Sequence, residues 1–98
     1  MRILLKFDLS LEAGNEAVCS GKIAELHQSL MERIQPEAAY FSTENGKRIS
    51  YIFIDLKDPS QLPAIAEPLF QDLGAHIQFI PVMNGDDLRS GLAGLAGS

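Results

Sequence analysis

Two side chains suited to acid–base chemistry stand far apart in this sequence, at positions 8 and 76. Asp8 lies near the end of an alternating segment, Arg2 to Leu9, and His76 lies at the start of a second apolar segment, AHIQFIPVM. If the two segments are antiparallel neighbours in one sheet, Asp8 meets His76. A carboxylate that orients an imidazole is used in general acid–base catalysis. The commoner structural explanation is a surface histidine paired with an acid at the rim of the sheet.

A second group of candidate residues depends on a turn at Asn45 and Gly46. These residue types tolerate the positive φ angles of a type I′ turn, which joins antiparallel strands through a two-residue loop. Such a loop pairs strand positions whose numbers sum to 91, so Tyr40 faces Tyr51. The predicted ligand-binding residues share this side of the sheet and combine aromatic surface with polar groups: Lys6, Tyr40, Tyr51, Phe53 and Gln78. Aromatic residues of this kind also commonly pack an interface without binding a ligand.

Charged residues on the first and third expected strands complete this side of the sheet. An antiparallel pairing places Arg2 opposite Asp55 and Lys6 beside Tyr51. Opposite charges across two strands contribute little to stability, but they help to specify register. We therefore expect a structural ion pair between Arg2 and Asp55.

The sequence predicts neither a metal site nor a cofactor. It contains two histidines and one cysteine, and HxH, HExxH and paired-cysteine motifs are absent. A lone cysteine excludes an internal disulfide and fits a reducing compartment. We expect Cys19 to be a small buried residue of a helix, with Asn15 as the N-cap of that helix and Gly21 at a close backbone approach in its interior.

Length and charge exclude several classes of partner. The chain has 98 residues, which is the size of one domain spanning residues 1–98. A net charge of −5 argues against nucleic acid, because binding to phosphates needs a basic surface. Lys6 and Asp8 interrupt the N-terminal apolar residues before they reach the length of a signal peptide, and no run is long enough to span a membrane. We therefore expect no membrane partner and a cytoplasmic location.

Hydrophobic periodicity predicts four strands and two helices. In chain order these are a strand over 2–9, a helix over 15–34, strands over 37–43 and 49–56, a helix over 58–73 and a strand over 75–83. Asp58 is the expected N-cap of the second helix, and Gly74 is the glycine expected after its last turn. The remaining residues, 84–98, are expected to form a flexible or short helical tail. This order predicts an α+β fold of the ferredoxin-like βαββαβ type, an antiparallel four-stranded sheet in the order 4-1-3-2 with both helices on one face.

The face covered by the helices is expected to carry the core residues Ile3, Leu5, Phe7, Leu9, Phe41, Ile52, Ile54 and Leu56. Helices on one face leave the other face of the sheet uncovered. The segment ISYIFIDL is apolar on both sides, so the uncovered face is not a polar one. Its expected apolar residues come from all four strands: Leu4, Tyr40, Ile49, Tyr51, Phe53, Ile80 and Val82. This exceeds the apolar patch usual on a monomer. We predict an isologous homodimer in which two sheets face each other, a dimeric α/β barrel.

Four stretches of the chain, GNEAVCSGKI, PEAAYFSTENGKR, DPSQLPAIAEPLF and PVMNGDDL, resemble a group of small bacterial proteins without an established function. The resemblance spans nearly the whole chain. It implies a dimeric α/β barrel of ferredoxin-like protomers. Members of the group are similar to sequences sometimes labelled as pantothenate synthetases. A ligase that uses a nucleotide needs a Gly-rich phosphate loop, which this sequence lacks.

Three functional hypotheses follow from these patterns. The first is a homodimer whose space between the sheets accepts a small apolar or aromatic molecule. The second is a small cofactor-independent enzyme of the isomerase or monooxygenase type, with His76 and Asp8 as its acid and base pair. The third is a structural or partner-binding dimer with a filled interior.

Overall fold

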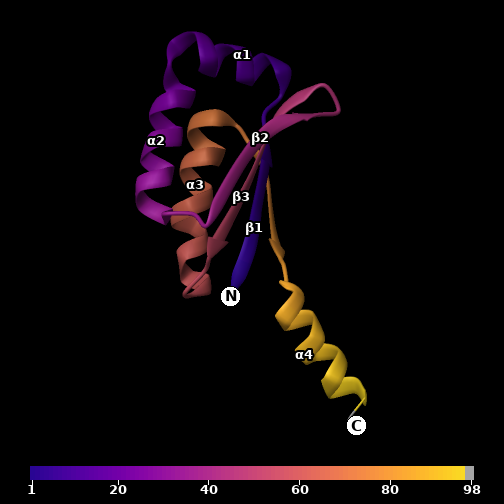
Figure 1. Ribbon diagram of the computed structural model, residues 1–98. Helices are drawn as coiled ribbons and strands as arrows, with labels where there is room; N and C mark the ends of the chain where they lie inside the picture. The colour runs from indigo at the N-terminus through magenta and orange to yellow at the C-terminus, as the bar shows by residue number, and fades with distance from the viewer. Residues whose placement is uncertain (97–98) are drawn as a thin grey trace.

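Four antiparallel strands form one open sheet in the order β2-β3-β1-β4, which matches the predicted order 4-1-3-2 (Figure 1). The computed structural model describes residues 1–96 of the chain, an α+β fold. Its elements are β1 (Arg2–Asp8), α1 (Leu11–Ser20), α2 (Lys22–Ile34), β2 (Ala38–Glu44), β3 (Lys47–Asp55), η1 (Pro59–Gln61, a 3₁₀ helix), α3 (Leu62–Leu73), β4 (His76–Pro81) and α4 (Gly85–Ala96). The expected βαββαβ order is therefore matched only in part, because two helices separate β1 from β2 and a further helix follows β4.

The predicted strand register is confirmed. Asn45 and Gly46 have φ angles of 55° and 75°, as a two-residue hairpin turn of this type requires. The turn pairs Tyr40 with Tyr51 across β2 and β3. All side chains on each strand are thereby assigned to one face or the other, since neighbouring residues on a strand point to opposite sides.

The predicted single helix over 15–34 is wrong. The chain forms two helices because Gly21 adopts a left-handed conformation, with φ of 80°, and ends α1. Ser10 caps α1 in place of Asn15, and its Oγ accepts a hydrogen bond from the Ala13 N–H at 3.1 Å. Gly21 makes no close backbone approach, because a Cβ built there would meet nothing within 4 Å. Cys19, expected to be buried, is exposed, because α1 buries the side that carries Gly14 and Ala17 and position 19 lies on the other side of the helix.

The start of the last helical segment before β4 is confirmed in detail. Asp58 accepts a hydrogen bond from the Ser60 N–H at 2.8 Å, and Gln61 accepts one from the Asp58 N–H at 3.1 Å, a complete capping box. The hydrogen bonds from Ser60 hold the pKa of Asp58 below its ordinary value. Gly74 ends α3 with a left-handed φ of 62°, as predicted for a glycine after the last turn.

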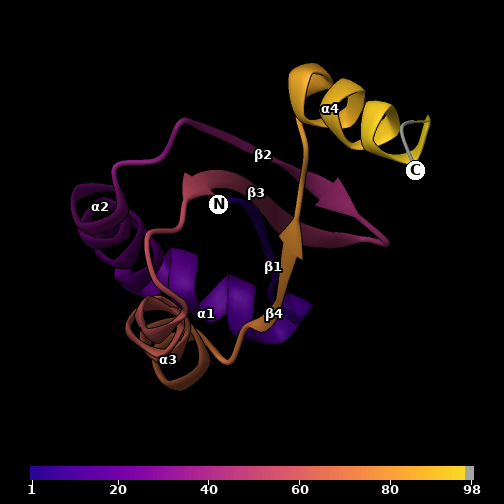
Figure 2. The same cartoon turned by 90° about the horizontal axis from the view of Figure 1, so that it is seen from below.

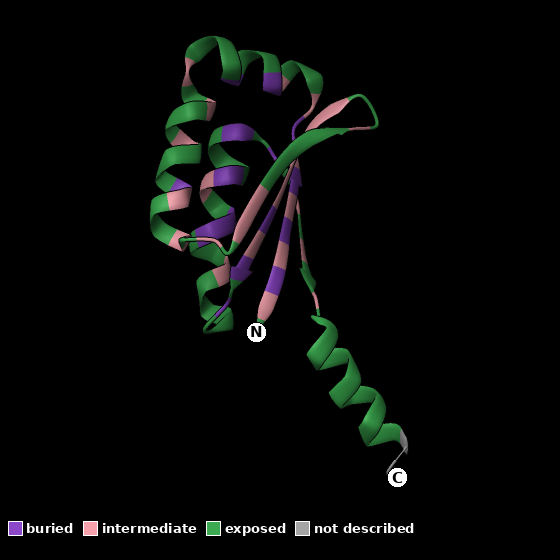
Figure 3. Ribbon diagram, viewed as in Figure 1, coloured by how far each residue is buried: buried purple, intermediate pink, exposed green. Residues whose placement is uncertain are grey.

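The core lies between the sheet and the layer formed by α1, α2 and α3 (Figure 3). Every second residue of β1 and of the end of β3 faces this layer, and the buried set is Ile3, Leu5, Phe7, Leu9, Ile52, Ile54 and Leu56. Phe41 was expected among them but is 55 % exposed. The reason is its place on the edge strand β2, where its main neighbour is the ring of His27 on α2, edge-on at 5.0 Å.

The opposite face of the sheet carries no helix of the body, and we call it the open face (Figure 2). Its residues alternate with the core residues along each strand. Ile49 was expected to lie uncovered on it but is buried, flanked on its two sides by the paired residues Asp8 and Ser42. Beyond β4, α4 leads away from the body as a 12-residue helix, longer than the short tail expected from the sequence. No helix of the described residues is both long and apolar enough to cross a bilayer.

Candidate functional site

The end of the open face beside the turn between β2 and β3, which is the upper end in Figure 1, brings Asp8 and His76 together, as predicted. They are paired residues of β1 and β4, and His76 Nδ1 lies 3.0 Å from Asp8 Oδ1. Both side chains reach solvent, His76 more than Asp8. The carboxylate therefore orients an imidazole at the rim of the sheet, an arrangement that permits proton exchange with a bound molecule.

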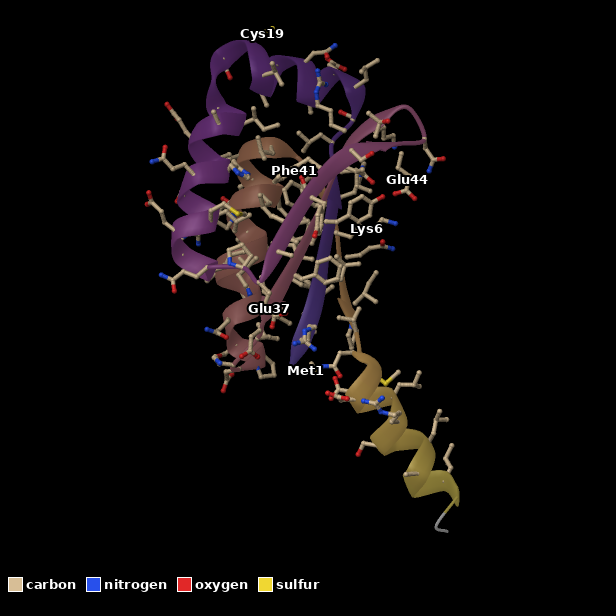
Figure 4. The ribbon with its side chains drawn as sticks, viewed as in Figure 1. Met1, Lys6, Cys19, Glu37, Phe41 and Glu44 are labelled. Atoms are coloured by element: carbon tan, nitrogen blue, oxygen red, sulfur yellow. The ribbon has the colours of Figure 1, made fainter. Side chains whose placement is uncertain are left out.

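Beside this pair, the carboxylate of Glu44 on β2 contacts side chains of two other strands, β1 and β3. Glu44 Oε2 accepts a hydrogen bond from the Tyr51 hydroxyl at 3.1 Å and lies 3.3 Å from Lys6 Nζ. Lys6 Nζ also lies 5.9 Å from the centre of the Tyr51 ring, within the range of a cation–π contact. Lys6 and Glu44 project from the sheet on the side away from α2 and α3 (Figure 4). The three side chains hold one another in place.

This arrangement changes the acidity of Tyr51. Partial withdrawal of the ring from water raises the pKa of its hydroxyl, and the hydrogen bond to Glu44 and the charge of Glu44 raise it further. The charge of Lys6 acts in the opposite direction. Tyr51 is therefore a neutral hydrogen-bond donor under ordinary conditions.

A shallow hollow of about 220 Å³ lies between these groups at the upper end of β1, β2 and β4. Its lining is Lys6, Asp8, Glu44, Asn45, His76, Ile77 and Gln78. Four predicted site residues, Lys6, Asp8, His76 and Gln78, thus line one hollow.

The predicted aromatic residues lie on the open face but outside this hollow. Tyr40 and Tyr51 are paired across β2 and β3, and Phe53 is paired with Leu4 of β1, nearer the lower end of the sheet. Tyr40 is 64 % exposed. The open face therefore has a polar upper half and a lower half in which an apolar row is followed, at the lower end of the sheet, by the charged residues Arg2 and Asp55.

Glu44 is the site residue that the sequence prediction missed. The signal for it was present, because Glu44 stands four residues after Tyr40 on the same strand and so shares its face. Its role depends on the cation and hydroxyl that β1 and β3 bring beside it.

The predicted ion pair between Arg2 and Asp55 is wrong, although the two residues are paired across β1 and β3. Arg2 Nε lies 2.8 Å from Glu37 Oε2. Asp55 instead binds the amino terminus of Met1 at 3.2 Å and Lys57 Nζ at 2.5 Å. Arg2 and Asp55 both lie at a sheet end where other opposite charges stand closer.

Metal-ligating side chains do not gather at this site. Across residues 1–96 no three histidine, cysteine or acidic side chains come close enough together to hold a metal ion. What the hollow offers a ligand is hydrogen bonding, charge and an oriented imidazole.

Comparison with known proteins gives no family assignment. No protein-family model, curated protein or solved structure matches this chain. Its function is therefore inferred from the geometry of the open face.

We expect the titration of Tyr51 to respond with opposite signs to changes in its two charged neighbours. In a Tyr40→Phe background only Tyr51 titrates, because the chain has 2 tyrosines. Glu44→Gln removes a charge that raises the pKa of Tyr51 and should lower it, whereas Lys6→Met should raise it further. The pH dependence of tyrosinate absorbance measures both shifts.

The raised pKa of Tyr51 also makes the stability of the folded state depend on pH in one direction. A folded state that holds this proton more tightly gains stability below the ordinary tyrosine pKa and loses it as the pH rises through the pKa of Tyr51.

In the titration experiment, equal tyrosinate titration curves for Glu44→Gln and Lys6→Met would contradict the contacts of Tyr51 with Glu44 and Lys6.

Proposed function

We propose that this chain is a cytoplasmic homodimer of ferredoxin-like protomers, a dimeric α/β barrel, whose space between the sheets binds a small apolar or aromatic molecule. The open face carries the proposal, because it combines uncovered aromatic surface with a fixed polar cluster. The residues proposed to contact the ligand are Lys6, Tyr40, Tyr51, Phe53 and Gln78. The resemblance of the sequence to small bacterial proteins of the dimeric barrel type supports the same assembly.

The area of the open face determines how strongly two bare faces would pair. Four strands spaced about 4.8 Å apart and about seven residues long present a face of roughly 400 Å², or roughly 800 Å² for two copies. With somewhat more than half of this area apolar, its burial contributes about 12 kcal/mol at about 25 cal/mol per Å². Association costs roughly 4–15 kcal/mol. The apolar gain thus lies within the range of the association cost, and pairing of the two bare faces is marginal.

The polar cluster suits the recognition of a ligand better than simple packing. Lys6 is held by Glu44 and lies against the ring of Tyr51, so its ammonium group is oriented before a ligand arrives. Pre-oriented groups cost less conformational entropy on binding. The aromatic rings of Tyr40 and Phe53 supply apolar surface beside it. This division, mostly apolar with a few convergent polar groups, is typical of small-molecule sites.

The assembly is tested by the mass of the particle. We expect light scattering at micromolar concentrations to give about twice the 10.7 kDa of one chain. Tyr40→Glu places a charge in the proposed contact and should raise the dissociation constant at least tenfold. Phe70→Glu is the control, because Phe70 is also exposed but lies on α3 in the helix layer. A wild-type protein that scatters as a monomer at micromolar concentrations would contradict the dimer.

The ligand space is tested with an aromatic probe, 8-anilinonaphthalene-1-sulfonate. We expect saturable binding by fluorescence, weakened roughly 10- to 150-fold by Phe53→Ala, since burying one aromatic side chain contributes about 1.5–3 kcal/mol. Phe70→Ala should leave the affinity unchanged. A dimer without saturable binding would instead favour the structural hypothesis, in which the interior is filled.

A specific observation favours a second candidate function. The distance of 3.0 Å between His76 Nδ1 and Asp8 Oδ1 is that of an oriented acid–base pair. We propose as the alternative a cofactor-independent enzyme of the isomerase or monooxygenase type, in which His76 exchanges a proton with the bound molecule and Asp8 orients the imidazole. Both residues line the hollow beside Lys6.

The enzyme hypothesis has its own test. In a turnover assay with small aromatic substrates, His76→Gln should lower kcat by roughly 100- to 10,000-fold, the usual contribution of general acid–base catalysis. His27→Gln is the matched control, because His27 lies on α2 against Phe41, on the helix side of the sheet. Unchanged turnover in His76→Gln would remove the proposed base.

A further inference from the structure

We propose that α4 is an exchanged arm, which packs its leucine side on the apolar row of the open face of the second copy and so closes the lower end of the ligand space. This inference rests on the dimer proposed above and adds the residues that the partner contributes. Each copy would give one arm and receive one, as two-fold symmetry requires.

The first observation is that α4 has an apolar side which its own body does not cover. Leu88 and Leu92 stand one turn apart on one side of the helix and are 46 % and 55 % exposed. Every residue from 85 to 95 is exposed. A helix with such a side is stabilised mainly by packing it against another surface.

The second observation is that the start of α4 is held in a fixed direction. The Val82 N–H donates to the Arg2 carbonyl at 3.2 Å, which continues the sheet up to residue 82. Asn84 and Asp87 then cap the helix reciprocally, through backbone-to-side-chain hydrogen bonds of 3.1 and 2.8 Å. Arg2 Nη1 also lies 3.9 Å from Asp87 Oδ2. Little freedom remains between β4 and α4.

This direction leads away from the chain's own sheet. In Figures 1 and 2, α4 extends past the lower end of β4, on the side of the sheet opposite α2 and α3. That is the side on which a second copy facing the open face would stand. The arm therefore points toward the partner in the proposed dimer.

The third observation is that the open face offers a matching surface. Its lower half contains a row of paired apolar residues across β3, β1 and β4, in which Leu4 lies between Phe53 and Ile80. The upper half holds the polar cluster around Lys6 and Glu44. Leucines from an arm suit this apolar row, where they would form the lower wall of the ligand space beside Phe53, and the polar cluster would form its upper end.

The area of the interface favours a second copy as the occupant. Two open faces alone bury roughly 800 Å², the upper limit of ordinary crystal contacts. A 12-residue helix about 18 Å long and about 10 Å wide adds roughly 180 Å² from each copy. The total of roughly 1,200 Å² reaches the range of specific, stable interfaces. The arms thus supply the additional buried area that the two sheets alone do not provide.

Site-specific photo-cross-linking of the full-length chain tests this inference. We place p-benzoylphenylalanine at position 92 and, as the matched control, at position 90, since Ser90 lies on the opposite side of α4. After irradiation we expect position 92 to give a covalent dimer on a denaturing gel, at least fivefold more than position 90. Mass spectrometry should map the link to open-face residues of β1, β2, β3 or β4.

Three outcomes would overturn the arm while leaving the dimer intact, as checked by light scattering of the same sample. They are a link within one chain, which means that α4 folds back on its own sheet; a link between two α4 helices; and no preference for position 92 over position 90. A monomeric wild-type protein would overturn the dimer and the arm together.

A second measurement does not depend on the cross-linker. Leu88→Asp combined with Leu92→Asp should raise the dimer dissociation constant at least tenfold, whereas Ser90→Asp should leave it unchanged. Because α4 lies outside the core, these changes do not disturb the fold of the body. Equal dissociation constants for the two variants would contradict the exchange.

Discussion

The structure depends on a sheet that is apolar on both faces in a chain with helices to cover only one. Strand β3 shows this most clearly, since Ile52 and Ile54 are buried beneath the helix layer while Tyr51 and Phe53 point the other way. Water is a poor neighbour for such a face, and the free energy of leaving it exposed grows with its area. The proposed dimer, the ligand space and the arm all answer this one constraint.

The same constraint explains why the polar residues of the open face are paired and lie toward its two ends. Charges next to apolar rings are tolerated when they are paired and remain near solvent. Lys6, Glu44 and Tyr51 satisfy one another at the upper end, and Asp8 and His76 do so beside them. Apolar side chains occupy the row between these groups and the charged pair positions Arg2 and Asp55 at the lower end. One surface can therefore combine an apolar region suited to a dimer contact with a polar region able to orient a ligand.

Local backbone geometry controls this placement. The turn at Asn45 and Gly46 sets the register of β2 on β3, and a slip of one residue would send Tyr40 and Glu44 to the helix side. The central position of β1 then brings Lys6 beside Tyr51 and Asp8 beside His76. A site made from four strands is in this way determined by one tight turn and two strand pairings.

The sequence alone determined the properties that depend on short stretches of chain. Strand alternation, the positive-φ turn and the Asp58 cap are set by residues within a few positions of one another, so the strand order, the register and the meeting of Asp8 with His76 were predicted correctly. Most of the buried residues of β1 and β3 followed from the same periodicity.

Only the tertiary structure decided which distant groups become partners. Gly21 was compatible with a helix interior or with a helix end, and the packing of α1 and α2 selected the end. Cys19 is exposed because it lies on the side of α1 opposite its buried residues. Arg2 had several acids within reach and pairs with Glu37. Ion pairs near solvent differ little in energy, so small differences in distance determine which pair forms. The direction of α4 was likewise outside the reach of periodicity, because it depends on contacts between both ends of the chain, Arg2 with Val82 and Asp87.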